Sequence, residues 1–288
     1  MPANAIRKPL LFCALAAALL LPGCSTLQIA YNFAGDMLES RAEDYLDLSP
    51  EQEAELEKQS AALIQWHRKA MLPKYAAFFT AQAEIAEAGG WSREQMKDTV
   101  AGFRALMDET VAGAAPFVAE VLAGHTTPEK LAYLEARMAE NTAERRAEEA
   151  AETREESIDE WVERRVERIE RFTGPLTDAQ EAIVRQHTET GYDRAQRWLD
   201  NRELRQGALV TFLRQAPSKD EIAGFVHRIL LHAHEIVDPA YREVSEARWA
   251  LQERMYHDVL AALNDEQRRE LAASLRSCAA DMTDLAGV

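Results

Sequence analysis

Two short stretches, Leu48-Ser49-Pro50-Glu51-Gln52 and Leu176-Thr177-Asp178-Ala179-Gln180, decide the fold. In each, a hydroxyl residue stands three positions before a glutamine, which is the pattern of a capping box at the start of a helix. Four further helix starts resemble them, and these are Ser92–Gln95, Thr127–Lys130, Ser218–Glu221 and Asn264–Gln267. Glycine and proline separate segments of helical periodicity, and no strand-like alternation stands out. The sequence therefore predicts an all-α, multi-helix bundle.

The helix starts also predict an internal repeat. They follow one another in the same order and at similar spacing in residues 48–138 and in residues 158–288. A repeat of this length implies two similar helical units that stack on each other or face each other. We therefore expect two similar helical halves.

The halves are joined by a long charged stretch. Between Pro128 and Gly174 there is no glycine or proline, so this stretch could form a single helix of roughly 65–70 Å at about 1.5 Å per residue. Its middle, residues 139–157, is charged and has only a thin stripe of alanines. We interpret it as a solvated connecting helix held by Glu–Arg pairs at helical spacing. The alternative is a coiled-coil-like contact surface, which would need larger apolar residues.

The charge of the chain limits its partners. The net charge is −16. Binding to nucleic acid requires a basic footprint opposite the phosphates, so this charge argues against nucleic acid as a partner. It argues equally against binding an anionic membrane surface through the protein's own charge. An acidic surface instead keeps a helical protein soluble.

Residues 1–23 have the three parts of a secretory signal peptide. Arg7 and Lys8 supply the positive charge, and an apolar run follows them. That run is too short to cross a bilayer as a helix, which needs about 20 apolar residues. It ends at Leu21-Pro22-Gly23-Cys24.

This ending resembles the lipobox of bacterial lipoproteins, which places a small residue directly before an invariant cysteine. The resemblance implies cleavage between Gly23 and Cys24, a diacylglycerol thioether on the Cys24 sulfur, and an acyl chain on the new amine. Several chains together make a firm anchor. Pro22 departs from the usual residues at its position, and the alternative is an ordinary signal peptide with a chance cysteine. Ser25 after the cysteine implies sorting to the outer membrane, with the inner membrane as the alternative.

Two features of the remaining chain follow from its apolar residues and cysteines. Residues 24–47 are too apolar for a free linker, so we expect this lipidated tether to pack on the body. Cys13 lies in the signal peptide and Cys24 carries the lipid, so no second cysteine remains to form an intramolecular disulfide with Cys278. A buried, inert thiol is one interpretation of Cys278, and a disulfide between two chains is the other.

Two family resemblances arise from short motifs. The chain resembles an uncharacterised family of proteobacterial lipoproteins in Cys24-Ser25, Tyr31-Asn32, Tyr45–Leu48, Gln52, Trp66-His67-Arg68 and Leu72–Ala76. That resemblance implies the architecture and no activity. The two stretches that open the helical halves also resemble the Leu-Thr-x-x-Gln signature of small periplasmic stress chaperones. Those proteins are all-helical and bind unfolded clients, but they are shorter and often carry a basic concave face.

No catalytic motif is found, and the best metal candidate is a group of histidines. The sequence contains no Gly-x-Ser-x-Gly, His-Glu-x-x-His, phosphate-binding loop or Cys-x-x-Cys pattern. His227 and His234, with Glu235 beside them, share a helical face but lie about two turns apart, while His232 would face elsewhere. Metal-binding histidines on a helix usually stand four residues apart. We therefore predict no metal site and no cofactor other than the lipid on Cys24.

The most distinctive candidate for a recognition patch is Trp66-His67-Arg68. One interpretation is a surface that binds a partner or an anionic head group. The other is a tryptophan anchor that packs beside Leu63 and toward Phe78, with solvated basic neighbours.

Together these features predict a non-enzymatic lipoprotein on the periplasmic side of the outer membrane. Its predicted partners are the lipid bilayer, through Cys24, and another envelope protein that it binds or scaffolds. One alternative is a chaperone-like holdase for envelope proteins. The other is a hydrolase with an unrecognised site, which would require a deep pocket with convergent polar groups.

Overall fold

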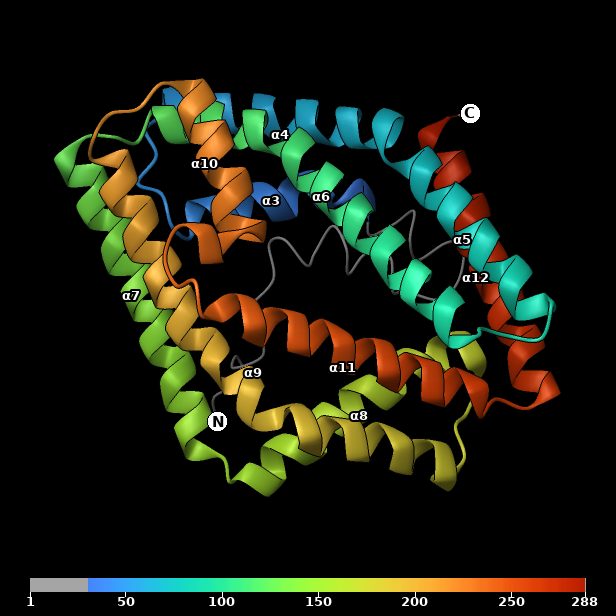
Figure 1. Cartoon of the computed structure of the whole chain (residues 1–288). Helices are drawn as coiled ribbons and strands as arrows, with labels where there is room; N and C mark the ends of the chain where they lie inside the picture. The colour runs from blue at the N-terminus through green and yellow to red at the C-terminus, as the bar shows by residue number, and fades with distance from the viewer. Residues whose placement is uncertain (1–30, 288) are drawn as a thin grey trace, which may run out of the picture.

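The computed structural model describes residues 31–287, apart from the side chains of residues 193–196. Its regular structure in this range is helical and contains no strand, which confirms the all-α prediction (Figure 1). The elements are α3 (Ala34–Glu43), α4 (Pro50–Ala70), α5 (Leu72–Glu87), α6 (Arg93–Ala123), α7 (Pro128–Ala151), α8 (Arg154–Thr173), α9 (Asp178–Leu213), α10 (Lys219–Leu231), the 3-10 turn η2 (Ala233–Glu235), α11 (Tyr241–Ala261) and α12 (Asp265–Ala286).

The predicted helix starts are confirmed. Each of the six has its expected residue at the N-cap in extended backbone, and those N-caps are Ser49, Ser92, Thr127, Thr177, Ser218 and Asn264. In five of them a glutamine or glutamate side chain returns to the N-cap backbone and completes the capping box. Capping satisfies amides that the first turn of a helix leaves without partners, so local sequence fixes these boundaries.

The two halves use their helices differently. Pro73 stands at the start of α5, and the chain changes direction between α4 and α5 at Met71. In the second half, α9 is one continuous helix of 36 residues that bends part-way along its length (Figure 1). Conversely, α6 is continuous over 31 residues, whereas the second half breaks between α10 and α11 at residues 232–240.

The halves interlock. The last helix of the second half, α12, lies alongside α5 of the first half, and the last helix of the first half, α7, lies alongside α9 of the second (Figure 1). Helix α10 packs on α6. Each half therefore covers the other, and the apolar clusters contain residues from both.

One such cluster joins α6 and α7 to the end of α9 and to α10. It includes Leu131 and Leu134 of the first half and Leu213 and Ile222 of the second half. A second cluster joins α5 to α12 and includes Met71, Leu72 and Met282. The third lies mostly in the second half, and its buried members include Ile158, Val184, Val259 and Leu275. Burial of apolar surface across these contacts is what holds the halves together.

Each half is closed by a similar set of hydrogen bonds. In the first, Gln52 Nε2 donates to the carbonyl of Gly124 at 2.7 Å, and Lys130 Nζ donates to Gln52 Oε1 at 2.5 Å. In the second, Gln180 Nε2 donates to the carbonyl of Ala262 at 2.8 Å, and Gln267 Nε2 donates to Gln180 Oε1 at 3.0 Å. The first glutamine of each half thus fastens its helix to the turn before the last helix.

The prediction of a single helix from Pro128 to Gly174 is wrong. Helix α7 ends at Ala151 and α8 begins at Arg154. Thr153 is the N-cap of α8, its side chain accepts from the Glu156 amide, and the Glu156 carboxylate accepts from the Thr153 amide at 2.8 Å. A capping box thus ends the helical run without glycine or proline.

The charged part of α7 is also not simply a solvated connector. Thr142 is buried, and its hydroxyl donates to Gln206 Oε1 at 3.2 Å. Arg146 pairs with Asp200 and Glu203 of α9, each at 2.8 Å. Thr142 and Arg146 therefore contact the second half, while most of residues 143–156 are exposed.

The tether lies partly within the described residues. Gly23 and Cys24 lie outside them, as do the signal peptide and the first residues of the tether. Tyr31 and Leu46 are buried in separate apolar clusters, and α3 packs on α4. Phe33 and Met37 are each 56% exposed. Within residues 31–287, no helix combines the length and the apolar character needed to span a bilayer.

Candidate functional sites

The Trp66-His67-Arg68 motif does not form a surface patch, because His67 is only 1% exposed. Its Nδ1 atom lies 2.8 Å from the Tyr31 hydroxyl, and its ring packs against that of Tyr75. Burial lowers the pKa of His67 to about 4, so the imidazole is neutral at physiological pH. The recognition-patch interpretation is therefore wrong for His67.

Trp66 and Arg68 also have structural contacts. The Trp66 indole packs on α6 against Phe117 and over Gly113, and not toward Phe78 as expected. A Cβ atom at position 113 would lie 1.9 Å from the indole, so only glycine leaves room for the ring. The Arg68 guanidinium lies 5.1 Å above the centre of the Tyr31 ring. The motif thus anchors α4 to α6 and to Tyr31, three residues before the start of α3.

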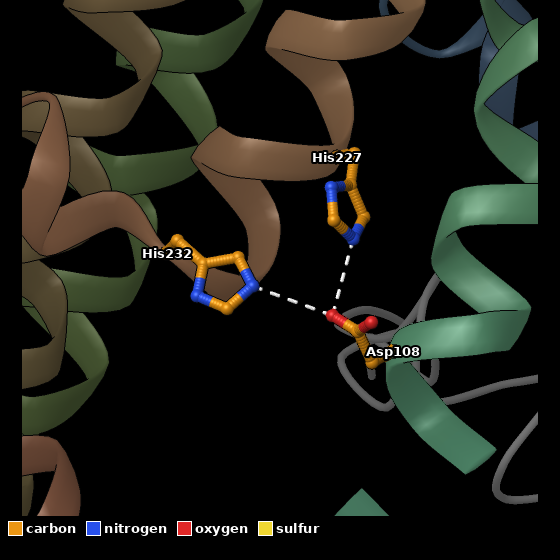
Figure 2. A group of neighbouring side chains, drawn as sticks. All are labelled: Asp108, His227 and His232. Carbon is orange, nitrogen blue, oxygen red and sulfur yellow. Dashed lines mark hydrogen bonds and ion pairs between the residues drawn. The ribbon is translucent and has the colours of Figure 1, made fainter. Parts of the chain in front are cut away.

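A different group of side chains converges between α6 and the end of α10. Asp108 Oδ1 lies 3.1 Å from His227 Nε2 and 3.3 Å from His232 Nε2 (Figure 2). The three ligand atoms all lie within 4.8 Å of one another. The side chains are 48%, 27% and 40% exposed, respectively, so the group is open to solvent on one side. This is a candidate metal centre.

The expected orientation of His232 is wrong, and the reason is local. Helix α10 ends at Leu231, and His232 has φ −122° and ψ 35° outside the helix. The prediction that His227 and His234 share a face assumed that the helix continues. Because it ends, His232 turns back toward His227, their ring centres are 5.5 Å apart, and His234 lies beyond them. Helical spacing does not apply across such a break.

Asp108 was missed by the sequence reasoning. It lies on α6, 119 residues before His227, and no local motif marks it. Only the packing of α10 on α6 brings the carboxylate to the histidines.

A second histidine group provides a contrast. Asp258 on α11 contacts His187 Nε2 through Oδ2 and His257 Nδ1 through Oδ1, each at 3.0 Å. The two imidazoles therefore bind different oxygens of one carboxylate. Arg93 also lies 3.9 Å from Asp258 Oδ1. The side chains are of the same types as in the Asp108 group, but they do not converge on one point.

An open groove of about 830 Å³ lies along α8, next to the start of α9. Its apolar residues are Ala151, Val162 and Val166, and its single basic residue, Arg185, pairs with Asp159 at 2.6 Å. The other lining residues are carboxylates, and together with Asp159 they are Glu152, Glu156, Glu160, Glu163, Glu167, Glu170 and Glu181. We call this the acidic groove. It contains none of the residues of the Asp108 group.

The remaining candidate, Cys278, is buried in the contact between α12 and α5. Its thiol is therefore not positioned to bond with a second folded chain.

Part of the chain matches a known protein family. Residues 44–242 match a family described as a family of unknown function, DUF6279. The chain belongs to the DUF6279 family. No curated protein and no solved structure matches it. The match is consistent with the expected resemblance to an uncharacterised family.

The matched range covers most of the DUF6279 chain that the structure describes. It includes α4 to α10 and therefore the acidic groove and all three residues of the Asp108 group. It ends at the start of α11, so α12, which covers α5, lies beyond it. The family gives no evidence of an enzyme.

Proposed function

We propose that this protein is a lipid-anchored envelope lipoprotein that binds a basic segment of another envelope protein in the acidic groove. In this proposal the protein catalyses no reaction. It is held on the periplasmic side of the outer membrane by the lipid on Cys24. The observation that carries the binding role is the groove itself, in which carboxylates surround three apolar side chains.

The charges of the groove favour a basic partner. Eight of its twelve lining residues are carboxylates, and its one arginine is already paired with Asp159. Hydrogen bonds from the Thr153 backbone and hydroxyl lower the pKa of the Glu156 carboxyl, so that group is ionised at neutral pH. A lysine- or arginine-rich segment would neutralise these charges.

The anchor would keep the side chains at the start of α3 near the membrane. Phe33 and Met37 stand 9 and 13 positions after Cys24, and an extended chain covers at most about 3.6 Å per residue. Phe33 is the N-cap of α3, Met37 lies on α3, and both side chains are exposed. They are therefore within reach of the bilayer to which Cys24 would be attached, and insertion of apolar side chains would add to the lipid anchor.

The two alternatives make less use of these observations. A holdase needs an extended apolar surface for unfolded clients, whereas the groove is dominated by charge. A hydrolase needs a pocket around convergent polar groups, and the acidic groove and the Asp108 group involve different residues. The binding role is therefore the function that the geometry supports best.

Photocrosslinking in living cells tests the proposal. A photoreactive residue replaces Glu163 in the groove, or Glu129 at the exposed start of α7 as the control position. We expect one dominant partner with a basic segment at position 163 and none at 129, and loss of the product when Cys24→Ala removes the anchor. Equal products at both positions, or no product at either, would refute the groove as the binding surface. A broad spread of unfolded envelope proteins would support the holdase alternative.

A matched pair of charge variants sharpens this test. Glu163→Arg with Glu167→Arg reverses two charges in the groove, and Glu94→Arg with Glu129→Arg reverses two exposed charges of the first half. Both pairs change the net charge by the same amount. The groove variant should lose the crosslink from a probe at Glu160, whereas the control variant should retain it.

A further inference from the structure

We infer that Asp108, His227 and His232 form a binding site for one divalent transition-metal ion, with Zn²⁺ as the best fit. The site is independent of the acidic groove and of the proposed partner. It joins the two halves, because Asp108 lies on α6, His227 lies on α10, and His232 directly follows α10.

Two of the three distances between the ligand atoms are close to those around a tetrahedral ion, and the two imidazole nitrogens lie within 4.8 Å of each other. Zinc binds imidazole nitrogen and carboxylate oxygen at about 2.0–2.2 Å, so two ligands at the tetrahedral angle lie about 3.3–3.6 Å apart. The carboxylate oxygen of Asp108 lies 3.1 Å from one Nε2 and 3.3 Å from the other. The same three side chains that form hydrogen bonds without metal therefore need to move only slightly to bind it. Figure 2 shows both imidazoles directed at this one oxygen.

The donor set determines the class of metal. Two imidazoles and one carboxylate suit Zn²⁺ and its neighbours among the late first-row ions. Ca²⁺ and Mg²⁺ prefer shells of oxygen ligands and would gain little from two nitrogens. Since all three side chains are partly exposed, water can complete the shell as a fourth ligand.

The fold holds these ligands on packed elements. Helix α10 packs on α6, and its buried residues Ile222 and Val226 lie in the same cluster as Ala115 and Ala119 of α6. His227 follows Val226 directly. One helical turn before Asp108, Arg104 pairs with Glu246 of α11 at 2.6 Å, so its charge is compensated. Asp108 and His227 thus lie on two packed helices, and His232 directly follows one of them, which reduces the entropy lost when the ion binds.

Metal titration of the full chain tests the inference. The protein, purified in detergent and stripped with a chelator, is titrated with ZnCl₂ by calorimetry and with CoCl₂ by visible absorption. We expect one ion per chain, the absorption of four-coordinate Co²⁺, and no heat from MgCl₂ at the same concentration. Asp108→Asn should weaken Zn²⁺ binding by at least ~10-fold, because it removes the ligand charge and leaves the shape unchanged.

The Asp258 group supplies the matched control. Asp258→Asn changes the carboxylate that contacts His187 and His257. It should therefore leave the Zn²⁺ affinity and the Co²⁺ spectrum as in the unmodified protein. His227→Gln should lower affinity as Asp108→Asn does, with thermal unfolding showing that the variant is folded. Absence of Zn²⁺ binding, one ion per two chains, or equal affinity for the Asp108→Asn and unmodified proteins would overturn the inference.

Discussion

The hydrogen bonds that close the two halves use corresponding positions but lie in different surroundings. In the second half, Gln180 and Gln267 are 3% and 5% exposed, so two neutral amides bond to each other in the core. In the first half, Lys130 takes the corresponding place three residues into the last helix, and it bonds to the half-buried Gln52 at the surface. In both halves the first glutamine bonds to the backbone before the last helix. Its side-chain partner is a buried neutral amide in the second half and a lysine ammonium near water in the first.

The histidines of the two halves also differ in their burial and in their contacts with carboxylates. His67 and His125 of the first half are buried, and neither forms an ion pair with a residue that the structure describes. All histidines of the second half lie within 4.0 Å of a carboxylate, and these are His187, His227, His232, His234 and His257. The first half therefore uses imidazole as a core side chain, and the second uses it as a polar group near the surface.

The largest expected effect of this contrast is on acid stability. The folded pKa of His67 is about 4, below the unperturbed value of about 6.5. As the pH falls from about 6.5 to 4, the unfolded chain binds a proton that the folded chain does not, so the free energy of unfolding falls by about 3 kcal/mol from this group. Above pH 6.5 this contribution is fully present. His67→Gln keeps a polar partner for Tyr31 and removes the titration.

Urea unfolding at a series of pH values measures this effect. The profile of His67→Gln should be flatter than that of the unmodified protein between pH 6.5 and 4. Parallel profiles would show that His67 is not a neutral core residue.

A second comparison concerns the glycines between packed helices. Gly113 on α6 faces the rigid Trp66 indole, and Gly191 on α9 faces Leu251 of α11, whose Cδ2 would lie 2.5 Å from an added Cβ. Gly113→Ala should lower the free energy of unfolding by about 2 kcal/mol, because overpacking outweighs the gain of about 1 kcal/mol in helix propensity. Gly191→Ala should change it by less than about 0.5 kcal/mol, because the end of a leucine can move. Denaturant unfolding followed by circular dichroism measures both, and equal losses would contradict the difference.

The smallest expected difference in the free energy of unfolding concerns the hydrogen bonds of Gln52 and Gln180 that close the two halves. Gln180→Ala removes partners from the Thr177 amide, the Ala262 carbonyl and Gln267, and buried polar groups without partners should cost about 2 kcal/mol. Gln52→Ala should cost about 1 kcal/mol, since water can replace its bonds at the surface. The same unfolding experiment compares them. A larger loss for Gln52→Ala would mean that burial does not set the strength of the closure.

The boundaries of the helices were predictable because capping is local. The six N-caps depend on residues within four positions of each other, so sequence alone identifies them. Thr153 has the same Thr-x-x-Glu pattern, but it was missed because charged helix formers surround it without glycine or proline. The burial of His67 also had a local signal, since Leu56, Ser60, Leu63 and His67 form one buried stripe of α4.

The Asp108 group was not predictable in this way. Its two histidines were visible as a cluster, but their geometry depends on the end of α10 at Leu231. The carboxylate comes from the other half, and its approach depends on tertiary packing. The contact between Asp108 and the histidines also lies where the two halves differ. The first half has one continuous helix, α6, where the second half has α10 and α11 separated by residues 232–240. A local sequence pattern cannot predict a contact between side chains that are 119 residues apart and meet only through helix packing.

The position of α12 has a consequence for how the chain folds. Arg276 on this helix contacts Glu87 on α5, 189 residues earlier in the chain, and Met282 completes the apolar cluster around Met71 and Leu72. Contacts of such sequence separation form late and slow the folding of a chain. The first half is therefore synthesised with the apolar side of α5 uncovered, and this side stays uncovered until the 22-residue helix α12 packs on it. The C-terminal helix completes folding, and any truncation that removes it would leave an aggregation-prone intermediate.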